Sequence, residues 1–210
     1  NLKRNLLLFT QIKDLKIPSI LVINMADRMD RKGISLDVEA MEKKLDTKIA
    51  LVSTRKNTGI DRIKELIADY KSISSKPILD TSRISPEYFE RLKSTFPQED
   101  LYKLWLVITQ DVNFMPIEKK RIQDATDFST KSKDELKKLQ HKETVLRYQL
   151  INNILKETYK VDFMAAKGLR ASLDKILTHK VFGYLIFFAI LLLIFQAIFE
   201  WSSYPMDFID

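Results

Sequence analysis

The chain has no cysteine and only two histidines among its 210 residues. The absence of cysteine excludes disulfides, iron–sulfur clusters and thiolate metal sites within this sequence. His141 and His179 lie too far apart in the sequence to resemble a metal-binding pair, and we interpret both as ordinary surface residues. The sequence therefore predicts no metal site of its own.

Glycine is also scarce, and its positions decide whether a phosphate-binding loop is present. The four glycines are Gly33, Gly59, Gly168 and Gly183. A loop of the type Gly-x-x-x-x-Gly-Lys-Ser/Thr needs two closely spaced glycines, because backbone N–H groups must close around the phosphates. No two glycines have that spacing, and motifs for binding Mg²⁺ or for positioning an attacking water are absent. We assign no catalytic residue and expect this chain alone not to hydrolyse a nucleoside triphosphate.

Long runs of one charge sign are missing as well. The formal net charge is +7, but Lys and Arg are interleaved with Asp and Glu through most of the chain. Such interleaving is typical of solvated helix faces, so we expect no nucleic-acid partner. Hydrophobic residues make up 45% of the sequence and concentrate near its end. The composition predicts a globular core followed by a separate apolar segment.

Two apolar runs are each followed by polar residues. Residues 20–23 (ILVI) precede Asn24-Met25-Ala26-Asp27, and residues 48–52 (KIALV) precede Ser53-Thr54-Arg55. Helical patterns at about 1–16, 37–45 and 60–71 alternate with these runs, which predicts two neighbouring parallel strands in an α/β sheet. Because ligands bind at the carboxyl ends of parallel strands, both polar stretches are candidate ligand contacts.

The residue types in these stretches fit a guanine base. A carboxylate can accept two parallel hydrogen bonds, and guanine, unlike adenine, presents a ring N–H and an exocyclic amine on one edge. Asp27 is the candidate for this contact, and Asn24 would brace its loop. The backbone N–H of Ser53 would donate to the guanine carbonyl oxygen. The alternative is that Asn24 and Asp27 only form a structural turn.

The two polar stretches resemble the base-reading motifs of translation-factor-type GTPases, Asn-x-x-Asp and Ser-x-Arg/Lys. The second residue of the first motif is usually Lys, and here it is Met25. The chain resembles the ferrous iron transport protein B (FeoB) family over residues 1–210. Three features carry this resemblance: the departure at Met25, residues 55–59 (RKNTG), and residues 177–183 (LTHKVFG) before an apolar run. The resemblance implies that the guanine base is surrounded by Asn24, Met25, Asp27, Ser53, Thr54 and Arg55.

The resemblance also implies what the chain lacks. In that family the phosphate loop and switch regions precede the helix with which this sequence begins. We therefore expect the chain to be a piece of a longer protein, with GTP or GDP as its nucleotide and Mg²⁺ bound only when the preceding part is present. The remainder of the transporter would be its partner, and ferrous iron would be handled by residues beyond Asp210.

A second, all-helical region follows the α/β part. Residues 72–84 have the turn-forming composition of a linker. Helical patterns begin at Ser85-Pro86, after residues 97–100 (PQED) and after Pro116, and a long one runs from about Ser132 to Tyr159. By resemblance this region is a helical spacer, acting like a GDP-dissociation inhibitor, between a G domain and the membrane.

The run from Val181 to Phe199 carries no formal charge. At about 1.5 Å per residue it is long enough to cross a hydrocarbon core of about 30 Å. Before it, the aliphatic residues of 169–177 share one helical face, which predicts an amphipathic helix on the membrane surface. The alternative is a buried helix of a soluble domain.

The charges on either side of this run predict its orientation. Lys167, Arg170, Lys175 and Lys180 precede it, and Glu200, Asp207 and Asp210 follow it. Basic residues remain on the cytoplasmic side, so we expect residues 1–180 in the cytoplasm of a bacterium and Trp201 and Tyr204 at the far interface of its inner membrane.

The predicted fold class is therefore α/β plus all-α, with a partial P-loop-type GTPase G domain. The predicted division is 1–72 for the C-terminal part of the G domain, 73–84 for a linker, 85–166 for the helical spacer, 167–180 for an amphipathic juxtamembrane helix, 181–199 for a transmembrane helix and 200–210 for the start of a periplasmic loop. The leading hypothesis is a part of a GTP-regulated, multi-pass ferrous iron transporter. The alternative is a membrane-anchored helical interaction protein that binds no nucleotide.

Overall fold

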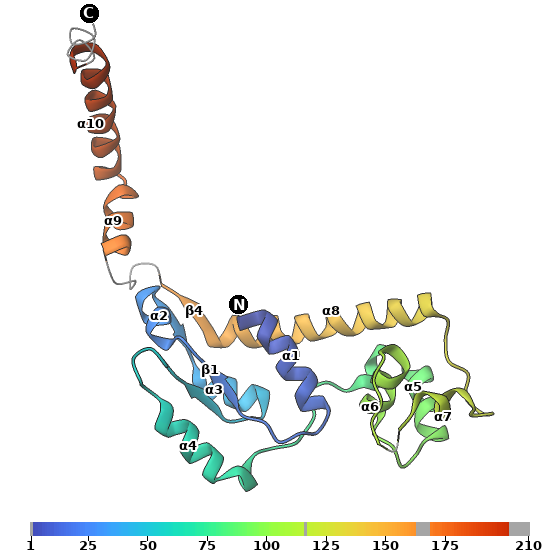
Figure 1. Cartoon of the computed structure of the whole chain (residues 1–210). Helices are drawn as coiled ribbons and strands as arrows, with labels where there is room; N and C mark the ends of the chain where they lie inside the picture. Colours follow the sequence, from blue (N-terminus) through green and yellow to red (C-terminus); the bar gives the residue numbers. More distant parts are fainter. Residues whose placement is uncertain (1, 116, 163–168, 202–210) are drawn as a thin grey trace, which may run out of the picture. The chain divides into compact units, whose positions relative to one another are not determined.

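The computed structural model describes residues 2–115, 117–162 and 169–201. The chain divides into two compact units, a first unit of residues 1–26 and 36–160 and a second unit of residues 27–35 and 161–210. The helices and strands follow one another as Figure 1 labels them. They are α1 (Leu2–Asp14), β1 (Leu21–Ile23), α2 (Ala26–Arg31), β2 (Ile34–Leu36), α3 (Val38–Leu45), β3 (Ile49–Leu51), α4 (Ile60–Ala68), α5 (Pro86–Thr95), α6 (Leu101–Thr109), α7 (Lys119–Gln123), α8 (Lys133–Thr158), β4 (Tyr159–Val161), α9 (Leu169–Leu177) and α10 (Phe182–Gln196).

Strands β1 and β3 are neighbours and run parallel, as the alternation of helices and strands predicted. Leu21 pairs with Ile49, and Ile23 pairs with Leu51. Ala50 and Val52 are buried against Leu66 of α4, in a small core of their own. Because the strands are parallel, the polar residues that follow each strand begin at the same edge of the sheet.

Helices α8 and α6 begin at capping side chains. Ser132 and Glu135 form a reciprocal capping box at the start of α8, and Asp100 accepts hydrogen bonds from the N–H groups of Tyr102 and Lys103 at the start of α6. Ser85 is the N-cap residue of α5, where a helical pattern was predicted to begin. Pro86 does occupy the first turn of α5, but the Ser85 side chain makes no capping hydrogen bond.

Strands β2 and β4 were not predicted from the sequence. The two strands lie far apart in the sequence but pair with each other as a two-stranded sheet. Asp37 donates its N–H to the Thr158 carbonyl at 2.8 Å, and Asp162 donates to the Gly33 carbonyl at 2.8 Å. The predicted long helix therefore ends at Thr158, because the next residues take part in a strand.

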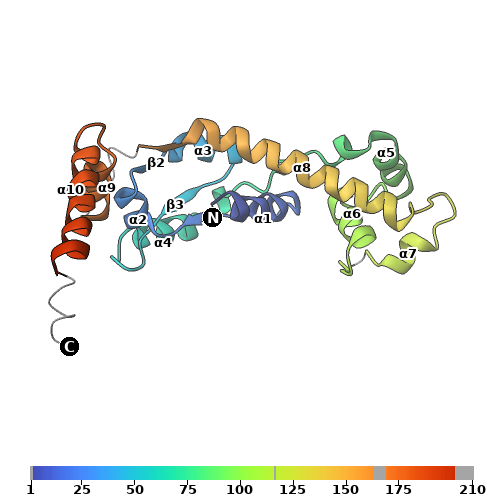
Figure 2. The ribbon, with the colours of Figure 1, turned by 90° about the horizontal axis from the view of Figure 1, so that it is seen from above.

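The helical part of the first unit has its own apolar core. Trp105 is fully buried and packs edge-on against Phe89, with ring centroids 5.4 Å apart. The other buried members are Ile84, Tyr88, Leu92, Phe96, Tyr102, Leu104, Val107, Ile108, Ile117, Ile122 and Phe128. Helix α8 contacts α6 beside this core and also lies against α1 and α3, as Figure 2 shows.

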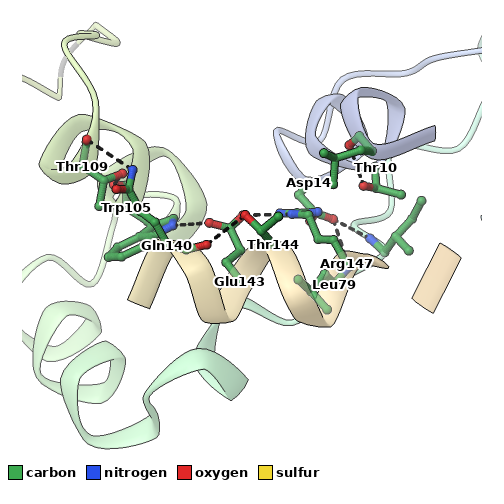
Figure 3. A network of polar contacts seen from close by, with 11 residues as sticks. Thr10, Asp14, Leu79, Trp105, Thr109, Gln140, Glu143, Thr144 and Arg147 are labelled. Carbon is green, nitrogen blue, oxygen red and sulfur yellow. Dashed lines mark hydrogen bonds and ion pairs between the residues drawn. The ribbon is translucent and has the colours of Figure 1, made fainter. Parts of the chain in front are cut away.

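A buried chain of charges joins α1, α8 and α6 (Figure 3). The Arg147 guanidinium contacts the Asp14 carboxylate at 2.6 Å and the Glu143 carboxylate at 2.8 Å. The Trp105 indole N–H donates to the other Glu143 oxygen at 2.7 Å. The side chains of Asp14 and Arg147 are each 1% exposed, so these charges are removed from water.

The residues at the end of α1 also hold the linker. Asp14 accepts hydrogen bonds from the backbone N–H groups of Ile78 and Leu79. The neighbouring Lys13, fully buried, donates to the carbonyl oxygens of Asp46 and Ser74. Burial lowers the pKa of Lys13, and the carboxylates of Asp46 and Asp14 oppose that shift. Consecutive residues of one helix therefore fix the chain between the α/β part and the helical part.

Helix α10 continues into a π-helical turn, Ala197–Trp201. In the part of the chain that the structure describes, one helix is long and apolar enough to cross a membrane, Phe182–Phe199, with a mean hydropathy of 2.5. None of it is buried inside the protein, which disagrees with the alternative of a buried soluble helix. Lys167, Tyr204, Asp207, Asp210 and the rest of 202–210 lie outside the described residues.

Candidate guanine-base site

The backbone itself joins the two polar stretches at the carboxyl ends of β1 and β3. The N–H of Val52 donates to the Ile23 carbonyl, and the N–H of Ala26 donates to the Val52 carbonyl, each at 2.9 Å. The stretch that begins at Asn24 and the stretch that begins at Ser53 are thus held side by side by the strand pair that precedes them.

Asn24 connects the two stretches through its side chain. Its Oδ1 accepts the Met25 N–H at 2.7 Å and the Thr54 N–H at 3.3 Å. Its Nδ2 donates to the Thr54 hydroxyl at 3.2 Å. An amide side chain donates from its nitrogen and accepts at its oxygen, whereas an ionised carboxylate only accepts. These bonds agree with the bracing role that the sequence predicted for Asn24.

Met25 takes a left-handed backbone conformation, with φ of 69°. A residue with a Cβ atom rarely adopts this region, and the conformation costs about 1–2 kcal/mol. The Asn24 side chain bonded to the Met25 N–H helps to hold it there. The methionine side chain is 52% exposed, so its burial does not stabilise the turn.

The loop after β3 closes on itself. Ser53 donates its N–H to the Thr58 carbonyl at 3.0 Å and accepts the Thr58 N–H at 3.1 Å. The Ser53 N–H, which the sequence predicted as donor to the guanine carbonyl, is bonded within the loop in this structure. The Thr54 N–H is bonded to Asn24, so the backbone N–H of Arg55, an exposed residue, is the next donor along the chain.

Gly59 ends this loop under a tight steric limit. Its φ is +78°, and a Cβ atom at this position would come within 2.3 Å of the Leu51 carbonyl oxygen. Only glycine combines that φ with such a close approach to the strand. Gly59 therefore shapes the loop that carries Ser53, Thr54 and Arg55. In the sequence it was only part of the 55–59 stretch that resembles the family.

Asp27 lies in the first turn of α2 rather than in an open loop. The Arg31 guanidinium, one helical turn later, lies 3.2 Å from Asp27 Oδ2, and the Asp27 side chain is 5% exposed. The sequence reasoning missed Arg31, although a spacing of four residues in a helix predicts such a pair. The carboxylate is thus engaged before any base could bind.

Among the described residues, no group of three or more His, Cys, Asp or Glu side chains could hold a metal ion.

Known proteins resemble the chain in sequence over its whole length. A family model described as ferrous iron transport protein B matches residues 1–67. The Fe(2+) transporter FeoB of Leptospira biflexa is 28% identical, with the alignment covering 100% of this chain and 32% of that protein. The chain is thus similar in sequence to the ferrous iron transport protein B family. A Porphyromonas gingivalis protein, the Fe(2+) transport protein A/Fe(2+) transporter FeoB fusion protein, is 27% identical over 100% of the chain and 27% of its own length. The chain thus spans about a third or less of these two FeoB relatives.

Solved structures agree on the fold. The cytosolic domain of the Thermotoga maritima FeoB iron transporter, in its GMPPNP form, superposes with a TM-score of 0.65 at 15% identity, over 75% of this chain and 63% of that one. The cytosolic domain of Legionella pneumophila FeoB gives a TM-score of 0.54 at 23% identity, over 76% and 64%. The FeoB resemblance that the motifs indicated is therefore confirmed.

Proposed function

We propose that this chain is the part of a GTP-regulated ferrous iron transporter that reads the guanine base and connects the base site to the membrane. The observation that carries the proposal is the Asn24 side chain, which ties the two stretches after the parallel strands together through Met25 and Thr54. A turn that served only β1 would not need bonds to the loop after β3.

In this proposal Asp27 accepts the ring N–H and the amine of guanine. In this structure, one oxygen of the Asp27 carboxylate contacts the Arg31 guanidinium. When the base binds, the carboxylate either breaks this ion pair or keeps it while also accepting the guanine hydrogen bonds. The N–H of Arg55 takes the place of the Ser53 N–H as donor to the guanine carbonyl. Met25 and Arg55, both exposed, flank the base.

The phosphates and the bound Mg²⁺ are held by other parts of the full protein. The sequence has no glycine pair that could form a phosphate loop. We therefore assign GTP hydrolysis to the complete transporter and guanine recognition to this chain.

Residues 85–166 act as the helical spacer in this proposal, and α10 is the first membrane helix. The fully exposed apolar surface of α10 favours a lipid environment, because water would contact the whole length of Phe182–Phe199. The amphipathic α9 lies on the cytoplasmic surface of a bacterial inner membrane, where its basic residues meet anionic lipid.

The test of base reading is a competition between GTP and XTP in the full-length transporter. Asp27→Asn exchanges an acceptor oxygen for an amide donor, which suits xanthine better than guanine. GTP binding should fall and XTP should gain relative to GTP. Asp61→Asn, in the exposed first turn of α4, is the matched control and should leave the preference unchanged.

A second candidate function rests on the Asp27–Arg31 ion pair. If this pair only stabilises α2, the chain is a membrane-anchored helical interaction protein without a nucleotide. An unchanged GTP-to-XTP preference in Asp27→Asn, together with GTP affinity equal to that of the wild type, would favour this second function.

A further inference from the structure

Residues 177–183 helped to indicate the family, but base recognition does not use them. They join α9 to α10, and His179 lies at their centre. The imidazole Nδ1 accepts hydrogen bonds from the backbone N–H groups of Val181 and Phe182, each at 3.3 Å. The ring also lies against the Phe182 ring, with centroids 5.0 Å apart.

These bonds satisfy groups that a helix normally leaves unpaired. The first N–H groups of a helix have no partner within the helix and need a side chain or water. The residue at the N-cap of α10 is Val181, whose side chain has no acceptor. His179 supplies the acceptor from two positions earlier. Its carbonyl oxygen also accepts the Gly183 N–H at 2.9 Å.

Gly183 lets the two helices approach closely at this junction. A Cβ atom at Gly183 would lie 2.5 Å from the Leu177 carbonyl oxygen, at the end of α9. Any larger residue must move either the last turn of α9 or the first turn of α10. The histidine and the glycine of the 177–183 stretch therefore act on the same bend.

We propose that His179 is the N-terminal cap of α10 and makes the α9–α10 junction a pH-sensitive elbow. The location of this elbow at a membrane surface rests on the proposed span, whereas the cap itself does not. Nδ1 can accept hydrogen bonds only while it carries no proton, so the proton of the neutral ring resides on Nε2. Protonation removes both bonds and places a positive charge at a helix N-terminus, where the helix dipole disfavours it.

The ionisable residues of the two helices and the junction are Arg170, Asp174, Lys175, Lys180 and Tyr184. Three of these five are basic, and Lys180 is adjacent to His179. Histidine is the side chain that ordinarily changes charge between about pH 5 and 8. We expect the bend to be held while the ring is neutral and released once the ring is protonated.

The experiment measures the α9–α10 distance in the full chain, reconstituted in nanodiscs of zwitterionic lipid. Because the sequence has no cysteine, Leu173→Cys and Leu185→Cys can carry a pair of spin labels at exposed positions. We expect one narrow distance peak at about pH 8 and loss of that peak at about pH 5. A peak that is identical at both pH values would overturn the proposal.

Variants separate the cap from general destabilisation. His179→Asn keeps an acceptor without a titrating proton and should retain the narrow peak at both pH values. His179→Ala should lose the peak at both, and a narrow peak in this variant would also overturn the proposal. His141→Gln, at an exposed position of α8, is the control and should behave as the wild type.

A second measurement reports the tautomer directly. Nitrogen NMR of the two histidines should show the neutral His179 ring with its proton on Nε2, and a proton on Nδ1 would contradict the cap. Failure of the proposed membrane span is seen separately. A spin label at Ile190 that is relaxed by a water-soluble agent rather than by oxygen would place α10 outside the bilayer. The distance peak would still test the elbow in that case.

Discussion

Asp14 receives hydrogen bonds from two different parts of the chain, helix α8 and the linker. One carboxylate oxygen contacts Arg147 of α8, and the other accepts the N–H groups of Ile78 and Leu79 in the linker. Arg147 in turn contacts Glu143, so a single buried guanidinium holds two carboxylates. Buried charges are stable only when they are paired, and removing one partner leaves the others without compensation.

Arg147→Ala should therefore be much more destabilising than the loss of a surface arginine. We expect a loss of about 3–5 kcal/mol in the free energy of unfolding, because Asp14 and Glu143 would remain buried and charged. Arg62→Ala breaks an exposed pair with Glu65 and should cost less than about 1 kcal/mol. Urea unfolding followed by the fluorescence of Trp105, which donates to Glu143, measures both. Equal losses of unfolding free energy in the two variants would contradict the argument that the buried ion pairs matter more than the exposed one.

The residue types of the base site could be predicted from the sequence, but their hydrogen bonds could not. Asn24 was expected to brace its loop, and its three bonds to Met25 and Thr54 do so. Ser53 was expected to offer its N–H to a ligand. That group instead pairs with Thr58, because the loop closes as an antiparallel bridge, which no local pattern in residues 53–59 indicates.

At the scale of elements, the loop after β3 depends on where residues with positive φ stand. Asn57 and Gly59 both adopt this region, with φ of 53° and 78°. Asparagine tolerates it better than most residues, and glycine pays no steric penalty there. Only Gly59 also lies against the strand, through the Leu51 carbonyl.

Gly59→Ala should consequently distort the loop that carries Ser53 to Arg55. The new methyl group would meet the Leu51 carbonyl oxygen in a backbone conformation that alanine disfavours, and we expect a cost of at least about 1–3 kcal/mol. Thermal unfolding should show a lower Tm, and guanine nucleotide affinity of the full protein should fall with it. Asn57→Gly, which relieves a positive φ two residues earlier, is the matched control and should not lower the Tm. A Gly59→Ala protein with unchanged Tm would contradict the steric argument.

Elements with strong local signals were predicted, and elements that depend on distant partners were not. Helix α8 combines a capping box at Ser132 with a sustained apolar face, so its start followed from the sequence. Strands β2 and β4 are three residues each and form only because Ile34–Leu36 meets Tyr159–Val161. Such short strands show no clear alternation, so their existence depends on tertiary pairing rather than on local pattern.

At the scale of the whole molecule, the chain combines two kinds of surface that need different solvents. Charged side chains cover the helices of the first unit, such as α4 with its Lys64–Asp61 pair. Along Phe182–Phe199, by contrast, the described helix exposes apolar side chains over its entire length. A single aqueous environment cannot suit both surfaces, because exposed contiguous apolar area of this extent favours association or insertion into lipid.

The charge asymmetry around α10 predicts the direction of insertion. Lys175 and Lys180 precede the helix, and Glu200 and Asp207 follow it in the sequence. Basic residues close to a span remain on the cytoplasmic side, so residues 1–180 should stay in the cytoplasm while Ser203 reaches the periplasm. Ser94→Cys, at an exposed position of α5, and Ser203→Cys give the test, since the chain offers no competing thiol. In intact cells a membrane-impermeant maleimide should label position 203 and spare position 94 until the membrane is opened. Labelling of position 94 alone in intact cells would reverse the orientation, and equal labelling of both positions would argue against a span.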